Sequence, residues 1–176
     1  MSRTLSSERI KVSKIDAAKR QLRTAILLWF LDEDPVSIHT LTAAAHEIIH
    51  RLFRQKGLSD LFFDSRQFKK EKQGEINKQT KKIAAFFKHA NSMPEPDIDF
   101  APDLNIALIM IILDGLARMD EPLSKIEDGF RLWYWLHYPG MLHEDIVAKL
   151  LPVDEIAWMR SLKKREFIEG FIKRKI

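Results

Sequence analysis

Apolar residues recur at intervals of three and four along most of the chain, the spacing that places side chains on one face of an α-helix. The first such segment runs from residue 13 to residue 32, and Ser13 with Asp16 has the form of a capping pair at its start. A second helix is expected to have Ser37 as its N-cap and Gly57 as its stop. Both segments are predicted to be amphipathic helices.

The third helical segment, residues 65–91, is divided in composition. Its basic first half offers only Phe68 and Ile76 to a core, whereas its last eight or so residues are densely apolar. We expect one long helix that projects past the body of the protein at one end, with an interruption near Gly74. Residues 92–102 then form a proline-rich acidic loop.

Two apolar residues, Ile98 and Phe100, are expected to anchor this loop. Asp103 is interpreted as the N-cap of a helix that continues to about Met119. That helix contains the most apolar run of the chain, residues 104–113. Since a membrane span needs about 20 apolar residues, this run predicts a buried core helix and no membrane segment.

The last third of the chain is also predicted to be helical. A fifth helix follows residues 120–124 and ends in the sequence HYPG at residues 137–140. A short helix over 143–151 is expected next, and after Pro152 one long helix that continues through Phe171.

No segment alternates in the way that predicts a strand, so the predicted fold is all-α. A chain of 176 residues suits a single-domain helical bundle of about five to seven helices over residues 1–176, with residues 1–12 as a flexible N-terminal arm. There is no cysteine, which excludes disulfides and thiolate chemistry. The N-terminus lacks the apolar core of a signal peptide, so a cytoplasmic location is expected.

Charge is strongly segregated along this chain. Residues 1–23, 66–88 and 160–176 carry net charges of +5, +6 and +5, and because the whole chain carries +4, the remainder carries −12. Such blocks either bind phosphates or form solvated helix faces. The candidate nucleic-acid contacts are Lys69, Lys70, Lys72, Lys78, Lys81, Lys82 and Lys88.

The sequence HEIIH, from His46 to His50, matches the HExxH pattern of zinc hydrolases. On a helix the two histidines share a face, which would leave Glu47 as the base. A catalytic zinc needs a third protein ligand from elsewhere in the chain, and Arg51 is charged where the helix of such enzymes is normally buried. No metal or other cofactor is therefore expected, and a zinc hydrolase stays an alternative.

A helical wheel gives another interpretation of these histidines. His39, His46 and His50 fall within about 40° of one another, beside the apolar face. His39 and His50 are about 16 Å apart along the helix, so the three cannot hold one ion. The stripe is expected either to bond to neighbouring helices or to meet phosphate beside the basic helix.

Trp133, Tyr134 and Trp135 are consecutive and cannot all face one core, because each helical step turns about 100°. An aromatic ring is therefore either exposed or buried against a second subunit. We expect a homodimer through this face.

Three quoted segments carry a resemblance: AAKRQLRTAILLWFLDEDPVSIHTLTAAAHEI, FFKHAN and FRLWYWLHYPG. They resemble a family of bacterial hypothetical proteins over most of residues 14–145. The resemblance implies a related helical fold and no particular activity.

At a coarser level the helical array resembles HEPN-type domains, which often dimerise and commonly cut RNA. Their nucleases carry an arginine followed, after four to six residues, by a histidine. The segment from Arg131 to His137 is similar to that motif, although Leu132 stands where a polar residue is usual. This resemblance implies that Arg131 stabilises phosphate charge and that His137 performs acid–base chemistry.

Three functions thus follow from the sequence. The first is a HEPN-like protein that binds RNA or other nucleic acid through its basic helix, residues 66–88, and its basic termini. The resemblance to HEPN-type domains adds ribonuclease activity as an expectation. The second is zinc-dependent hydrolysis through His46, Glu47 and His50. The third is a non-catalytic module whose basic helix docks on an acidic protein.

Overall fold

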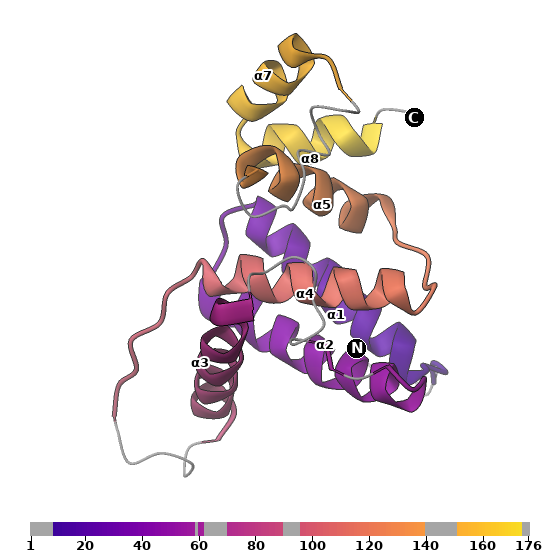
Figure 1. Ribbon diagram of the computed structural model, residues 1–176, viewed down its shortest axis with the longest axis vertical. Helices are drawn as coiled ribbons and strands as arrows, with labels where there is room; N and C mark the ends of the chain where they lie inside the picture. Colours follow the sequence, from indigo (N-terminus) through magenta and orange to yellow (C-terminus); the bar gives the residue numbers. More distant parts are fainter. Residues whose placement is uncertain (1–8, 59, 62–69, 90–95, 140–150, 174–176) are drawn as a thin grey trace, which may run out of the picture.

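The computed structural model describes residues 9–58, 60–61, 70–89, 96–139 and 151–173 (Figure 1). Every regular element in these ranges is a helix, which confirms the all-α prediction. The numbering of Figure 1 passes from α5 to α7. The seven helices are α1 (Lys14–Phe30), α2 (Pro35–Gln55), α3 (Lys70–Lys88), α4 (Leu104–Arg118), α5 (Lys125–His137), α7 (Val153–Ser161) and α8 (Lys164–Lys173).

α1 and α2 form the helical hairpin of the N-terminal half. Ser13 begins α1 through the predicted capping box with Asp16. The prediction that Ser37 caps α2 was wrong, because the helix begins two residues earlier, after Asp34. Pro35 needs no hydrogen-bond partner for its nitrogen, and the Asp34 carboxylate accepts the N–H of Ser37 at 2.8 Å.

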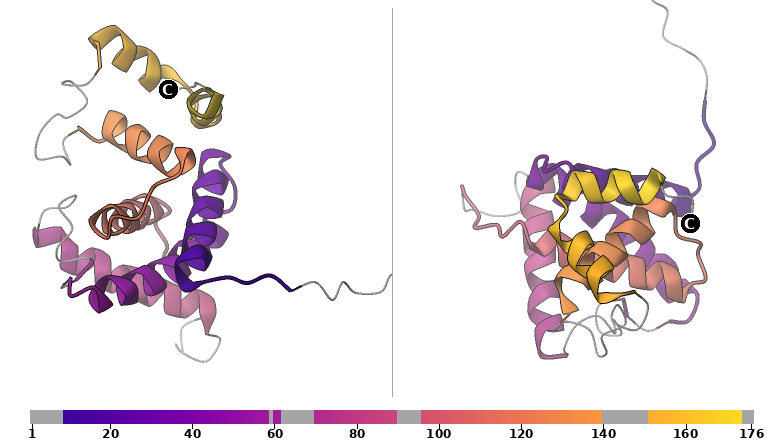
Figure 2. Two further views of the ribbon diagram at one scale, coloured as in Figure 1. Left: turned by 90° about the vertical axis from the view of Figure 1, so that its right-hand side faces the viewer. Right: turned by 90° about the horizontal axis from the view of Figure 1, so that it is seen from above.

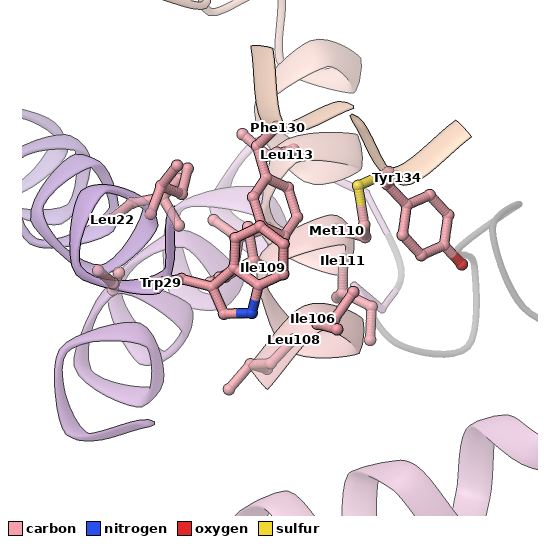
Figure 3. Packing of buried hydrophobic residues seen from close by; sticks show 14 of the residues in the cluster. Leu22, Trp29, Ile106, Leu108, Ile109, Met110, Ile111, Leu113, Phe130 and Tyr134 are labelled. Atoms are coloured by element: carbon pink, nitrogen blue, oxygen red, sulfur yellow. The ribbon is translucent and has the colours of Figure 1, made fainter. Parts of the chain in front are cut away.

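α4 lies in the middle of the molecule, between α5 and α2 (Figure 1), and most of its residues are buried. In Figure 3 the ring of Trp29 from α1 lies against that of Phe130 from α5, with their centroids 5.0 Å apart. Asp103 is the N-cap residue of α4, as predicted, but it does not cap the helix through its side chain. Its backbone is already helical and its side chain makes no capping bond, because a turn that begins at Ala101 leads into the helix.

α3 packs across α2 and α4 and is continuous through Gly74. The predicted interruption at that glycine was therefore wrong. Gln73 and Thr80 are both buried, so the basic first half contacts the body through polar residues that the apolar pattern did not single out. Phe68 and the expected start of this helix lie outside the described residues.

The loop before α4 is anchored as predicted at Phe100. Its ring meets the rings of His39 and Phe87 edge-on, with centroids 5.2 and 5.4 Å away. These contacts hold residues 96–101 close to α3.

The prediction of one long helix after Pro152 was wrong. The backbone becomes extended at Leu162, and the Glu166 carboxylate accepts the N–H of Lys163 at 3.1 Å to begin a separate helix, α8. The short helix expected over 143–151 lies almost wholly outside the described residues.

One hydrophobic core includes residues from all seven helices. Residues 9–12 are exposed and lead away from the bundle (Figure 2), as expected for the end of an N-terminal arm. Among the described residues, no helix combines the length and apolar character needed to cross a membrane.

Candidate functional site

The two histidines of the HEIIH sequence lie side by side on the surface of α2 that faces α3. The His46 and His50 rings are nearly parallel, inclined by 23°, with their centroids 5.7 Å apart. Four residues separate them in a helix, so this stacking follows directly from the helical repeat.

The opposing wall comes from α3, the helix that carries the central basic block. Asn77, Lys81, Ala84 and Lys88 recur at intervals of four, three and four, so they share one side of α3. Lys88 donates to the Glu47 carboxylate across the gap at 3.1 Å. The structure therefore brings the histidine stripe and the basic helix together.

Between these walls lies a cavity of about 270 Å³, hereafter the His–Lys cavity. Its lining residues are Ala43, His46, Glu47, His50, Asp60, Asn77, Thr80, Lys81, Ala84, Ala85, Lys88 and His89. Asp60 follows the turn after α2, and His89 directly follows α3. The other lining residues belong to α2 and α3.

Three buried polar atoms that belong to this cavity have no hydrogen-bond partner in the described part of the protein. They are Nδ1 of His50, Oδ1 of Asn77 and Oγ1 of Thr80. A buried polar atom without a partner costs about 1–3 kcal/mol, so water or a polar ligand that bonds to these three atoms would stabilise the folded protein. The hydroxyl, the amide and the two lysines can all donate hydrogen bonds.

The cavity holds His46 in its neutral form. Burial first, and the proximity of His50 second, lower the pKa of His46 to about 3. A negatively charged occupant would oppose this shift, since it would stabilise the imidazolium. A bound anion would therefore raise the pKa of His46.

His39, the third histidine of the stripe, is structural. Its Nδ1 lies 2.8 Å from Oδ1 of Asn105, whose amide donates to the Pro35 carbonyl at 3.0 Å. Because Oδ1 only accepts, His39 must donate from Nδ1. Burial lowers the pKa of His39, and its bond to Asn105 opposes part of that shift.

The donor set does not fit the catalytic zinc site of the alternative hypothesis. In the described ranges, no group of three His, Asp or Glu side chains is placed to hold a metal ion. Glu47, the expected base, is instead paired with Lys88. We derive no chemistry through a metal at this site.

The lysines predicted to contact nucleic acid divide into groups. Lys81 and Lys88 line the His–Lys cavity, whereas Lys82 lines a different cavity. Lys78 is exposed. Lys70 and Lys72 lie in α3 but their side chains are not described, and Lys69 lies outside the described residues.

Arg131 and His137 are not brought together. The Arg131 guanidinium lies 4.8 Å from the centre of the Trp135 ring, and it pairs with Asp128 at 3.6 Å. His137 stacks on Trp133 at 4.2 Å and donates from Nδ1 to the carbonyl of that residue at 2.8 Å. Since six residues of helix turn Arg131 and His137 about 120° apart, and each stacks on a different tryptophan, the two side chains occupy different sides of α5.

The consecutive aromatic residues of α5 pack mostly against other residues of the same chain. Trp133 and Tyr134 are buried, and the Trp133 ring meets Trp29 of α1 with centroids 4.4 Å apart. Trp135 is half-buried under Arg131. These rings therefore need no second subunit to cover them, and the homodimer stays a prediction.

Comparisons of the chain with protein-family models, with curated proteins and with solved structures find no match.

Asn77, Thr80 and Asp60 belong to the site but were not predicted from the sequence. Asn77 could have been found, because it lies four residues before Lys81 on the same side of the helix. Thr80 gave no signal, since its burial depends on packing against α2. Asp60 gave no signal either, because Gly57 marks the end of α2 but does not indicate where the following residues lead.

Proposed function

We propose that this protein binds single-stranded nucleic acid, RNA in the first instance, and that the His–Lys cavity receives one phosphate group of the strand. The observations that carry the proposal are the unpartnered Oγ1 of Thr80 and Nδ1 of His50, both able to donate to a phosphate, in a cavity edged by Lys81 and Lys88. Phosphate oxygens accept hydrogen bonds, and Lys81 and Lys88 supply positive charge for them, which the Glu47 and Asp60 carboxylates of the same cavity offset.

The surroundings of the cavity support a polyanion over a single small anion. Lys78 and Lys82 are exposed on neighbouring parts of the same helix, outside the cavity. A strand that places one phosphate in the cavity can therefore place others beside these side chains. Affinity for such a strand should fall with salt, because bound counterions are released on binding.

The test is fluorescence anisotropy with a labelled single-stranded RNA at several salt concentrations. Replacing Lys81 and Lys88 together by glutamine should weaken binding about tenfold or more, since each removes a charge-assisted hydrogen bond. It should also reduce the slope of log affinity against log salt by about 0.7 for each lost phosphate contact.

A matched control replaces Lys163 and Lys173, exposed lysines of the C-terminal region, by glutamine. This variant has the same change in net charge and should retain nearly full affinity. If both variants lose affinity equally, binding depends on net charge alone and the cavity is not the site. If a folded protein binds no RNA or DNA strand, the proposal is wrong, and docking on an acidic protein becomes the hypothesis to test.

The finer expectations stay predictions that accompany this proposal. They are a HEPN-like arrangement of the helices, a homodimer and a cytoplasmic location. Cleavage by Arg131 and His137 is not part of the proposal, because α5 holds these side chains apart.

A further inference from the structure

A second, larger cavity lies on the other side of α3. It has a volume of about 610 Å³ and is formed by Gln79, Lys82, Ile83 and Phe86 of the helix with residues 97–101 of the loop before α4. We propose that this cavity, hereafter the Phe–Asp cavity, receives a nucleobase of the bound strand and selects guanine. The inference rests on the proposed function.

The helical repeat places the two cavities on opposite sides of α3. At 100° per residue, the α3 residues that line the His–Lys cavity centre about 180° from those that line the Phe–Asp cavity. Lys78 falls close to midway between the two groups, on the exposed side, and Thr80 falls near the buried side. A helix with its side chains is about 10 Å across, so a short extended strand can cross it from one cavity to the other past Lys78.

The lining of the Phe–Asp cavity suits a flat aromatic ring. Phe86 and Phe100 contribute faces or edges of benzene rings, and Ile83 and Ile98 add aliphatic surface. The aromatic side chains are held in position, because Phe87 meets Phe86 and Phe100 edge-on with centroids 6.1 and 5.4 Å away. Stacking of a base on such rings tolerates all four bases and so supplies affinity without selectivity.

The polar groups of this cavity supply the selectivity. Asp97 and Asp99 are carboxylates and can only accept hydrogen bonds, so they require a base that donates. Guanine presents two adjacent donors on its Watson–Crick edge, N1–H and the exocyclic N2 amino group, which one carboxylate can accept together. Uracil offers a single N–H, and a bare phosphate offers only acceptors and negative charge. Lys82 can meet the phosphate attached to the selected base.

The first experiment measures the binding of short RNA strands that differ at one position. A strand of uridines with a single guanosine should bind more tightly than the same strand with an adenosine at that position, and about tenfold more tightly than the strand with an abasic residue there. Asp99→Asn and Phe86→Leu should each reduce this ratio, while leaving the affinity of the abasic strand unchanged. Lys125→Gln, an exposed change on α5, is the control and should leave the ratio as it is.

A positional measurement keeps the inference testable if Phe86→Leu disturbs folding. A strand with 6-thioguanosine at the selected position, irradiated with the wild-type protein, should crosslink to residues 79–86 or 97–101. Crosslinks elsewhere, or equal binding of the guanosine and abasic strands, would overturn the base site alone. If the wild-type protein binds neither the guanosine strand nor the abasic strand, the proposed function is wrong as well. If free guanosine monophosphate competes as well as the strand does, the cavity serves a free nucleotide and the inference is wrong.

Discussion

At the scale of single residues, His46 shows how packing changes the chemistry of a side chain. In the unfolded chain its pKa is near the ordinary value of 6.5, whereas burial lowers the pKa in the folded protein to about 3. Between these values the unfolded state binds more protons, so the free energy of unfolding must fall as the pH falls.

We predict that His46 makes the protein about 2 kcal/mol less stable at pH 5 than at pH 7. His46→Gln should remove most of that difference, because glutamine does not titrate. The measurement is urea unfolding at both pH values. His89→Gln is the control, since His89 is exposed, and it should keep the full pH dependence. An undiminished pH dependence in His46→Gln would show that other groups, such as His39, account for the effect.

At the scale of elements, two glycines show that one substitution can have opposite effects in two helices. Gly74 lies in α3 with nothing within 4 Å of the position that a Cβ would occupy. Gly115 lies in α4, where a Cβ would overlap the Cδ1 of Leu61, a fully buried side chain. The first glycine only weakens its helix, whereas the second permits close packing.

We predict that Gly74→Ala stabilises the protein by up to about 1 kcal/mol, the difference in helix propensity between these residues. Gly115→Ala should destabilise the protein, because overpacking costs about 1–3 kcal/mol. The Leu61 side chain is fully buried, so it cannot rotate into solvent to make room for the new methyl group. Chemical unfolding of the two variants in parallel is the measurement. A loss of stability in Gly74→Ala would show that α3 needs flexibility at this point, as the sequence first suggested.

At the scale of the whole molecule, aromatic contacts connect the two ends of the chain. The Phe167 ring of α8 stacks on Phe30 of α1, with centroids 6.2 Å apart. Lys164 of α8 lies 4.0 Å from the centre of the Trp29 ring and pairs with Asp32 at 2.7 Å. α8 lies at the opposite end of the molecule from α3 (Figure 1).

We predict that Phe167→Ala lowers the free energy of unfolding by about 3–5 kcal/mol, the usual cost of deleting a buried phenyl ring. Below the unfolding transition, affinity for RNA should not change, because the ring is remote from both cavities. Ile172→Ala, an exposed position on the same helix, should cost less than about 0.5 kcal/mol. A parallel loss of RNA affinity in a folded Phe167→Ala protein would show that the two ends are coupled.

The sequence alone determined the helical class and most of the helix boundaries. Boundaries were correct where the signal is local: the capping box at Ser13, the left-handed Gly57 after α2 and the proline after α5. They were wrong where two local signals compete, as with Asp34 and Ser37, or where the break depends on packing, as at Leu162. The histidine stripe and the basic helix were also visible, because both follow from a helical repeat.

Only the tertiary structure decided which of these features meet. It placed His46 and His50 of α2 against Lys81 and Lys88 of α3. A helical wheel gives the direction of each side chain from its own axis, but not the neighbour it points to. That depends on how all the helices pack around α4, a balance of many small contacts that no short stretch of sequence contains.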